Sequence, residues 1–148
     1  PLQDVLPDCL TALQPQAQRA VIQLPEGDGF YPGRVLADPR RLRQILFNLL
    51  GNAVKYNREG GAVMLRIVPD GDMIRIEIED SGVGIPPMQR DRLFEAFNRL
   101  GREASSIEGS GLGLALSRRL AELMGGTLNY VPVDSGGSLF ILALPSAA

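Results

Sequence analysis

The sequence contains no histidine, and this absence excludes several kinds of chemistry. Without imidazole there is no His-based zinc site, no Ser-His-Asp or Cys-His nucleophile pair and no histidine general base. Cys9 is the only cysteine, so an internal disulfide framework and a thiolate metal cluster are excluded, which fits a reducing compartment. Any chemistry must therefore use carboxylates, amides, basic side chains, backbone N–H groups, or an imported ion or nucleotide.

Long apolar runs and basic tracts are also absent. No run approaches the roughly 20 apolar residues that span a bilayer, and no secretory signal is present, so we expect no direct membrane insertion of this domain and a cytoplasmic location. The net charge of −2 argues against a nucleic-acid partner. A length of 148 residues fits a single domain, 1–148, which we expect to be monomeric on its own. Because the chain begins at Pro1 without Met, we expect it to be part of a longer protein.

Apolar periodicity predicts about five strands and three main helices. The helices are expected over 2–18, ending near Gln14-Pro15, over 38–57 and over 111–124, the last with Leu112, Leu116, Leu120, Leu123 and Met124 facing inward. The strands are expected over 19–24, 62–68, 73–79, 127–133 and 138–144, with a small further strand at 34–36. Antiparallel hairpins dominate this order. The expected fold is therefore an α/β (α+β) two-layer sandwich, a mixed, mainly antiparallel sheet with the helices on one face.

The helix from Asp38 to Asn57 carries two stripes of side chains. Asp38 is a candidate N-cap, and Pro39 suits the first helical position, where its missing N–H costs nothing. One stripe is apolar and predicts a core face. It consists of Leu42, Ile45, Leu46, Leu49, Leu50, Ala53 and Val54. The other stripe is a polar row, which is either a solvated face or a binding surface, and it consists of Asn48, Asn52, Lys55 and Tyr56.

Three further segments could contribute to a site. Asp80-Ser-Gly82-Val-Gly84 follows a strand. It either forms an Asx-type turn or places the Asp80 carboxylate where it accepts a hydrogen bond from an amino group of a planar ligand. Gly109-Ser-Gly111-Leu-Gly113 precedes a helix, and it is either a hinge or an anion site made of backbone N–H groups. Phe94-Glu-Ala-Phe97 is typical of a packing anchor for the polar loop that follows it.

The order and spacing of these segments resemble the ATP-binding catalytic domain of bacterial sensor histidine kinases over essentially the whole chain. The segment 42–56 is similar to the N box of that family, and Asp80 to Ile85 is similar to its G1 box. Leu93 to Phe97 resembles its F box, and Gly109 to Leu114 resembles its G2 box. The resemblance implies the Bergerat-type ATP-binding fold, with ATP and Mg²⁺ as cofactors and an ATP lid at about 98–110.

The resemblance also implies roles for individual residues. Asn52 would coordinate Mg²⁺, Asn48 would help hold the phosphates or the metal, and Lys55 would neutralise phosphate charge. Asp80 would accept a hydrogen bond from the adenine amino group, and Tyr56 would pack on adenine. Gly82 and Gly84 would let the adenine base approach the backbone. Gly109, Gly111 and Gly113 would present backbone N–H groups to the phosphates. The remaining expected ATP contacts are Ile85, Phe97, Leu112 and Arg99, with Arg102 as a second lid candidate.

Two features of the sequence depart from this pattern or limit it. Ala96 stands where the family often has Pro, which removes no functional group. The phosphoacceptor is missing, since histidine kinases carry their reactive His in a separate dimerisation domain and this chain has none. The expected partners are therefore a His-containing dimerisation domain of the parent protein and, downstream, the receiver domain of a response regulator.

Position 48 helps to separate the possible reactions. Related ATPases of the gyrase and heat-shock chaperone type usually carry Glu here as a base for water, whereas an amide cannot accept a proton at neutral pH. Asn48 therefore predicts slow hydrolysis and transfer to an external nucleophile. Three alternatives stay open at this point: a degenerate ATP-binding module, an ATP-driven dimerising clamp, and a serine/threonine kinase of the anti-sigma-factor type.

Overall fold

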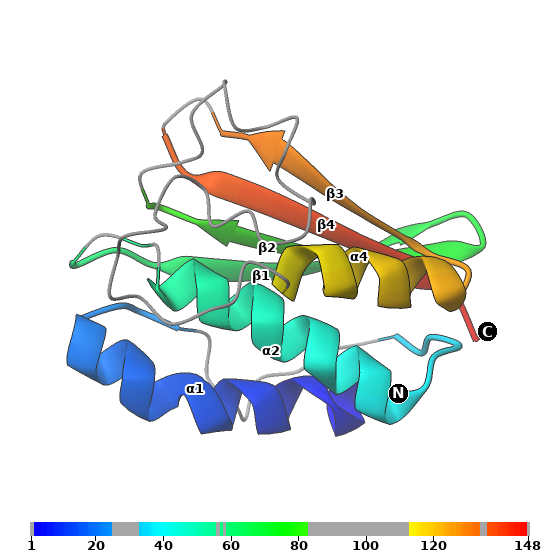
Figure 1. Ribbon diagram of the computed structural model, residues 1–148, viewed down its shortest axis with the longest axis horizontal. Helices are drawn as coiled ribbons and strands as arrows, with labels where there is room; N and C mark the ends of the chain where they lie inside the picture. Colours follow the sequence, from blue (N-terminus) through cyan, green and yellow to red (C-terminus); the bar gives the residue numbers. More distant parts are fainter. Residues whose placement is uncertain are drawn as a thin grey trace.

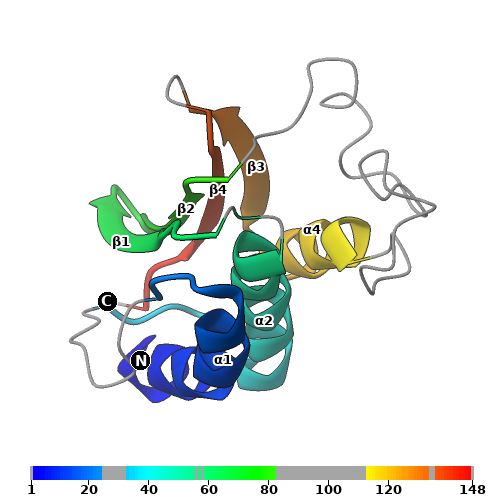
Figure 2. The same cartoon turned by 90° about the vertical axis from the view of Figure 1, so that its left-hand side faces the viewer.

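The fold consists of one four-stranded sheet with helices packed on one of its faces (Figures 1 and 2). We analysed a computed structural model, which describes residues 2–24, 33–55, 57, 59–82, 113–133 and 136–147. Within these residues the order of elements is η1, α1, α2, β1, β2, α4, β3 and β4. All pairs in the sheet are antiparallel, in the order β1-β2-β4-β3, and the helices α1, α2 and α4 form the second layer. The expected two-layer sandwich is confirmed.

Helix α2 (Pro39–Lys55) forms as its sequence predicts. Its N-cap is Asp38, whose Oδ1 accepts a hydrogen bond of 2.9 Å from the backbone N–H of Arg40 and so satisfies one of the free N–H groups of the first turn. The predicted apolar stripe is buried in full, together with Gly51. Leu46 and Leu50 are completely buried. Helix α2 thus lies at the centre of the helical layer, between α1 and α4 (Figure 1).

Helix α1 (Leu6–Ala20) follows the short 3-10 helix η1 (Leu2–Asp4) and is longer than predicted. The prediction that the helix ends near Pro15 is wrong. Proline removes only one hydrogen bond, and residues on both sides of it pack into the core, with Leu13 and Ala17 both buried. The C-cap of α1 is Val21, which adopts the left-handed conformation with φ of 58° and directs its N–H to carbonyl groups of the last turn.

The number of strands differs from the prediction. The sheet consists of β1 (Val63–Asp70), β2 (Met73–Asp80), β3 (Thr127–Pro132) and β4 (Ser138–Pro145). The strand predicted over 19–24 is wrong, because its first two residues belong to α1 and only Gln23 makes a bridge, parallel to Ala62. The small strand predicted at 34–36 is likewise a single bridge, between Val35 and Ser146. The part of the chain that the structure describes therefore contains four strands, where the sequence suggested about five.

Strand β2 has one face toward the helices and one face covered by ion pairs. Ile74, Ile76 and Ile78 are buried on the helical side. On the other side, Glu77 lies between the guanidinium groups of Arg66, at 3.1 Å, and Arg75, at 3.2 Å. Although this side of the strand carries charged residues, only 9% of Glu77 is exposed, and its carboxylate is paired with both arginine side chains.

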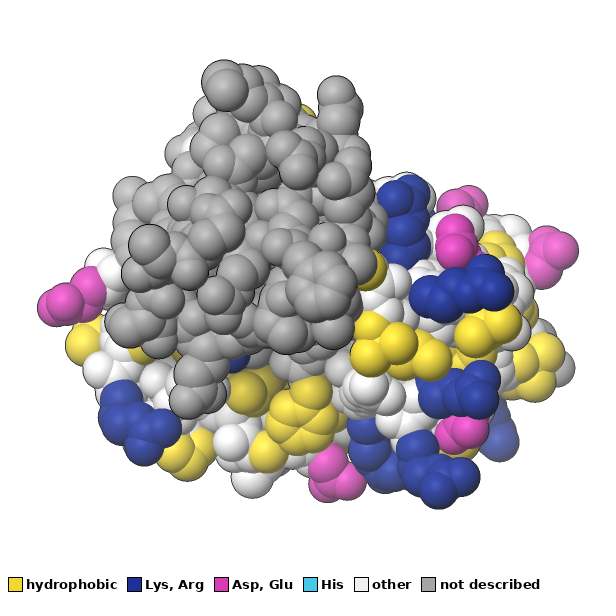
Figure 3. All heavy atoms as spheres, viewed as in Figure 1, with side chains coloured by type: hydrophobic (Ala, Val, Ile, Leu, Met, Phe, Trp, Pro, Cys, Tyr) yellow, Lys and Arg dark blue, Asp and Glu magenta, His cyan; other side chains and the backbone are white. Residues whose placement is uncertain are grey.

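Helix α4 (Gly113–Leu123) packs through a face that matches the prediction only in part. Leu116 and Leu123 were expected inside but are 45% and 56% exposed, whereas Leu120 is buried as expected. The buried face includes the small residues Ser117 and Ala121, which let α4 approach α2 closely. On the outer surface of this layer, apolar side chains lie among those of Lys and Arg (Figure 3).

The two ends of the described chain lie together. The backbone N–H of Leu2 donates to the carbonyl oxygen of Gly33 at 3.0 Å, and that of Ala147 donates to the carbonyl oxygen of Arg34 at 2.9 Å. Adjacent residues of one connecting segment therefore hold both ends (Figures 1 and 2).

Candidate functional site

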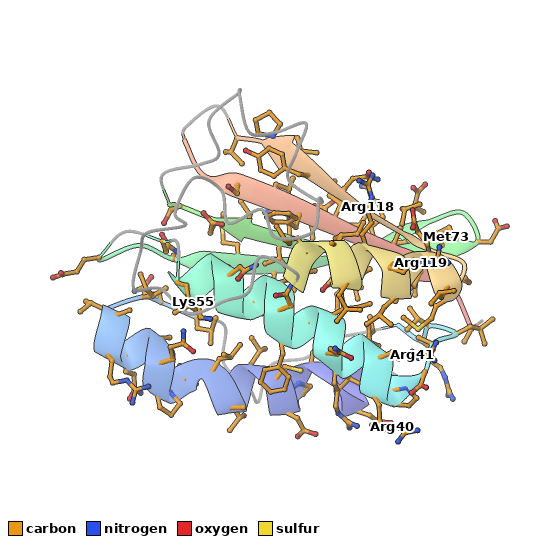
Figure 4. The ribbon with its side chains drawn as sticks, viewed as in Figure 1. Arg40, Arg41, Lys55, Met73, Arg118 and Arg119 are labelled. Carbon is orange, nitrogen blue, oxygen red and sulfur yellow. The ribbon has the colours of Figure 1, made fainter. Side chains whose placement is uncertain are left out.

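The polar row of α2 forms the centre of the candidate site. Asn48 and Asn52 are half-buried and lie one turn apart, while Lys55 is exposed. Figure 4 shows Lys55 at the C-terminal end of α2, opposite the end that carries Arg40 and Arg41. Because a helix rises about 1.5 Å per residue, the row from Asn48 to Lys55 extends about 10 Å along the helix.

The beginning of α4 packs directly against Asn48. The side-chain Nδ2 of Asn48 donates a hydrogen bond of 3.0 Å to the hydroxyl oxygen of Ser117. A Cβ atom at Gly113 would overlap the side-chain oxygen of Asn48 and would lie 3.0 Å from its Cγ. Only glycine fits at position 113 without displacing this amide. The structure thus brings together two residues that the sequence predicted for one site, Asn48 and Gly113.

Asp80 lies at the end of β2 and is 8% exposed. Its Oδ1 accepts a hydrogen bond of 2.9 Å from the backbone N–H of Gly82, and the backbone N–H of Ser138 on β4 also donates to the carboxyl group. Burial raises the pKa of Asp80, the two backbone N–H groups lower it, and the charge of Glu79 raises it. The net effect is an increase. A carboxylate has lone pairs beyond those that two donors use, so Asp80 keeps the capacity to accept a hydrogen bond from a ligand.

A hydrogen-bond network joins the Asp80 turn to the end of α2. The hydroxyl of Ser81 donates to Oδ1 of Asn57 at 3.2 Å and accepts the backbone N–H of Ala62 at 2.8 Å. Asn57 Nδ2 in turn donates to the carbonyl oxygen of Ala62 at 3.0 Å. The segment that follows α2, the beginning of β1 and the end of β2 are therefore fixed relative to one another. Through this network and the contact of Asn48 with α4, α2 is connected both to the Asp80 turn and to the beginning of α4.

Several residues that the sequence predicted for the site lie outside the described part of the chain. They are Tyr56, Gly84, Ile85, Phe97, Arg99, Arg102, Gly109, Gly111 and Leu112. Their assignment remains a prediction from the sequence, as does the lid at about 98–110.

The sequence analysis did not identify Ser117, Ser138 or the network of Ser81 and Asn57. Ser117 had a recognisable signal, since it lies four residues after Gly113 and therefore on the same face of α4. Ser138 contributes only its backbone, which sequence reasoning cannot assign before the register of β2 and β4 is known.

The donor groups of this region suit a hard cation better than a soft one. Among the described residues there is no group of three or more His, Cys, Asp and Glu side chains that could hold a metal ion. Burial raises the pKa of the Cys9 thiol to about 11, so this side chain is protonated at neutral pH and supplies no thiolate. The amide oxygens of Asn48 and Asn52 are hard ligands. They fit Mg²⁺, which usually binds few protein groups and completes its shell with water and phosphate oxygens.

Comparison with known proteins identifies the class. The family of histidine kinase-, DNA gyrase B- and HSP90-like ATPases matches residues 37–148. This chain belongs to that family. No helix among the described residues is long and apolar enough to cross a bilayer.

The most informative relatives are sensor kinases. The chain is 40% identical over 121 residues to the aerobic respiration control sensor protein ArcB of Escherichia coli K12, a match that covers 79% of this chain and 16% of ArcB. It is 43% identical over 110 residues to the circadian input-output histidine kinase CikA of Synechococcus elongatus, covering 74% of this chain and 15% of CikA. The chain thus spans only about a sixth of the length of these relatives.

Solved structures agree with this assignment. The mycobacterial sensor histidine kinase MprB superposes with a TM-score of 0.83 at 29% identity, over 98% of this chain and 95% of that one. Full-length ShkA, crystallised in complex with AMPPNP, superposes with a TM-score of 0.80 at 33% identity, over 100% of this chain and 31% of ShkA.

Proposed function

We propose that this chain is the catalytic domain of a two-component sensor histidine kinase. In this role it binds Mg-ATP and presents the γ-phosphoryl group to a histidine on a separate dimerisation domain of the same parent protein. The observation that carries the proposal is the pair of contacts made by α2 and the segment after it: Asn48 bonds to Ser117 of α4, and Asn57 bonds to Ser81, the residue next to the buried carboxylate of Asp80. The names of ArcB and CikA as sensor protein and histidine kinase support the signalling role.

Asp80 is the residue proposed to select adenine. It is held from two sides by backbone N–H groups, so its orientation does not depend on a flexible side-chain partner. An ionised carboxylate accepts hydrogen bonds only, so it favours the exocyclic amino group of adenine over the carbonyl oxygen of guanine. Gly82, buried beside it, allows the base to approach the backbone.

The phosphates and the cation are assigned to α2 and the beginning of α4. Asn52 would supply an amide oxygen to Mg²⁺, Asn48 would act beside it, and the ammonium group of Lys55 would balance phosphate charge. When bound, Mg²⁺ neutralises negative charge on the phosphates and holds them in one geometry. The first N–H groups of α4, which begins at Gly113, form the positive end of a helix dipole that favours an anion.

The same residues explain why an external acceptor is needed. Asn48 is an amide and cannot take a proton from water, so hydrolysis is expected to be slow. The chain contains no histidine, so it cannot be its own acceptor. In the transfer step the bond between the γ-phosphorus and its bridging oxygen breaks, a bond from the histidine nitrogen to phosphorus forms, and ADP leaves. We further propose that a response-regulator receiver domain takes the phosphoryl group from the histidine, and that the reaction occurs in the cytoplasm.

The test is a transfer assay with separated parts. The 148-residue chain is mixed with the His-containing dimerisation segment of its parent and γ-labelled ATP. We expect the segment to become labelled, and we expect this labelling to disappear when its histidine is replaced. With the Asp80→Asn chain the labelling should be at least about tenfold weaker, because the adenine contact is weakened. Binding of ATP without any labelled histidine would leave a non-enzymatic ATP-binding module as the better description. Rapid ATPase activity with ATP-dependent self-association would favour a dimerising clamp.

A further inference from the structure

Ser117 is a buried hydroxyl on the apolar face of α4. It is 2% exposed, and its companions on the buried face are Leu114, Leu120 and Ala121. A hydroxyl in such surroundings costs free energy unless it is hydrogen-bonded. Its partner here is the side chain of Asn48 on α2, 69 residues earlier in the chain, at 3.0 Å. The only described side-chain contact of this hydroxyl therefore reaches the polar row of α2.

The two contacts with α4 fix the orientation of the Asn48 amide. Its nitrogen is bound to Ser117, and its oxygen lies against Gly113, one turn earlier on the same helix. The amide NH₂ group is therefore turned toward the core of the helical layer. The oxygen is the polar atom of Asn48 that lies at the beginning of α4, where an anionic ligand would be held.

From this geometry we infer that Ser117 is a positioning residue for Mg-nucleotide binding. It accepts the hydrogen bond of Asn48 and thereby directs the amide oxygen toward the cation or a water bound to it, so that Asn48 does not present an N–H donor to the phosphates. The inference rests on the proposed function, since it needs the Mg-ATP site. It adds a residue that contacts neither nucleotide nor metal and acts through Asn48.

The competing explanation is that the pair only joins two helices. Loss of Ser117 would then lower stability and leave nucleotide binding unchanged. A double-mutant cycle separates the two explanations, because a positioning residue has no effect on binding once the residue that it positions is gone.

The experiment measures the affinity of AMPPNP by calorimetry, with and without Mg²⁺. The chains are the wild type, Ser117→Ala, Asn48→Ala and the double variant. We expect Ser117→Ala to lose about tenfold in affinity with Mg²⁺ and much less without it, the scale of one well-placed hydrogen bond. In the Asn48→Ala background the same substitution should cause no further loss. Ala121→Gly is the matched control, since it weakens α4 one turn further along the same buried face and removes no hydrogen-bonding group.

Two results would overturn the inference. One is wild-type affinity in Ser117→Ala, and the other is an equal loss in the presence and absence of the Asn48 side chain. If the wild-type chain itself failed to bind Mg-AMPPNP, the proposed function would fail, and that result is distinct from both.

A second measurement needs no substitution. In NMR spectra of the unliganded wild-type chain, the side-chain NH₂ protons of Asn48 should exchange with solvent more slowly than those of Asn52, which is also half-buried on α2. Equal exchange rates would contradict a persistent bond to Ser117, even if Ser117→Ala did not fold.

Discussion

At the scale of single residues, Asp80 combines burial with a negative charge. Its carboxyl group is almost completely enclosed, and it is accompanied by Glu79 rather than by a cation among the groups that shift its pKa. Two backbone N–H groups offset part of the cost of desolvation, but the pKa is still raised. Desolvation therefore disfavours the charge of this residue in the unliganded chain, and a hydrogen-bond donor on a ligand would favour the ionised form.

This shift predicts a pH-dependent difference between the wild type and Asp80→Asn in the absence of nucleotide. Because the pKa is higher in the folded chain than in the unfolded chain, the folded chain retains the proton more strongly. The resulting stabilisation is complete below the unfolded pKa, about 4, and is lost as the pH rises through the raised folded value. The free energy of unfolding of the wild type, relative to the variant, should therefore decrease as the pH rises through this window.

Urea unfolding of both chains between pH 3 and 7 would measure this difference, and the other carboxylates cancel in the comparison. A relative free energy that is constant or increases with pH would show that the environment of Asp80 does not disfavour its charge.

Gly113 gives a second prediction at this scale. A methyl group at this position would overlap the amide oxygen of Asn48, so Gly113→Ala should displace that side chain and lower the affinity for Mg-nucleotide by at least about tenfold. Gly51→Ala is the control, because Gly51 is on α2 and its added methyl group would meet no heavy atom of the described residues within 4 Å, apart from its own stretch of helix. The control should bind nucleotide normally and gain about 1 kcal/mol in free energy of unfolding. Equal affinity in both variants would contradict the close packing at Asn48.

Some contacts at this scale could be predicted from sequence and others could not. Asn48 and Asp80 could be predicted as site residues from the sequence. Asn is a poor helix former inside an otherwise apolar helix, and a carboxylate followed by two glycines is typical of a ligand contact or a tight turn. Ser117 did not, because its role depends on how close α4 lies to α2. The distance between the two helices depends on which stripe of α4 faces α2, the one with large leucine side chains or the one with the small residues Ser117 and Ala121.

At the scale of elements, α1 ends under backbone strain. Val21 is a β-branched residue in the left-handed conformation, which is costly for any residue with a Cβ atom, and it is 56% exposed. Its position is maintained by the hydrogen bond of 2.9 Å from the N–H of Ile22 to the carbonyl oxygen of Ala17. The strain is therefore a consequence of how α1 ends and not of packing by the Val21 side chain.

Val21→Gly should relieve this strain and raise the free energy of unfolding by about 1 kcal/mol, since glycine adopts the left-handed region freely. Val21→Ala keeps a Cβ atom and serves as the comparison, with little or no gain expected. Both values come from urea denaturation. A loss of stability in the glycine variant would mean that apolar contacts of Val21 outweigh its backbone strain.

The elements also show where periodicity is a reliable guide. Helix α2 was predicted well because its cap, its apolar stripe and its length all agree. Helix α4 was located correctly, but its inward face was predicted only in part, since Leu116 and Leu123 have helical spacing as good as that of Leu114, Ser117 and Ala121. Large apolar side chains are a poor indicator of the buried face when small residues permit closer helix packing. The strand predicted over 19–24 failed because tertiary packing extended α1 past Pro15.

At the scale of the whole molecule, the two-layer architecture followed from the sequence because hairpins and amphipathic helices admit few arrangements. The four motif segments are far apart in the sequence, and among the described parts α2 brings the Asp80 turn and the beginning of α4 into one region. Binding of a ligand across that region should stabilise the molecule as a whole.

Mg-ADP at a free concentration of 100 times its Kd should add about 2.7 kcal/mol to the free energy of unfolding and raise Tm by about 5–10 °C. Removal of Mg²⁺ with EDTA at constant ADP should reverse most of this gain. Differential scanning fluorimetry would measure both, with Asn52→Ala as the variant in which EDTA has little effect. A Tm that does not respond to Mg²⁺ in the wild type would contradict the metal assignment.

The pairing of the two chain ends with Gly33 and Arg34 has a topological consequence. Since adjacent residues hold Leu2 and Ala147, a short flexible linker could join the ends directly, and a new beginning and end could be placed at the turn of Gly71. Such a circular permutant should retain the strand pairings of the sheet, apart from the pair of Asp70 and Met73 next to the opened turn. Any segments attached to the two ends would leave the domain from a single place.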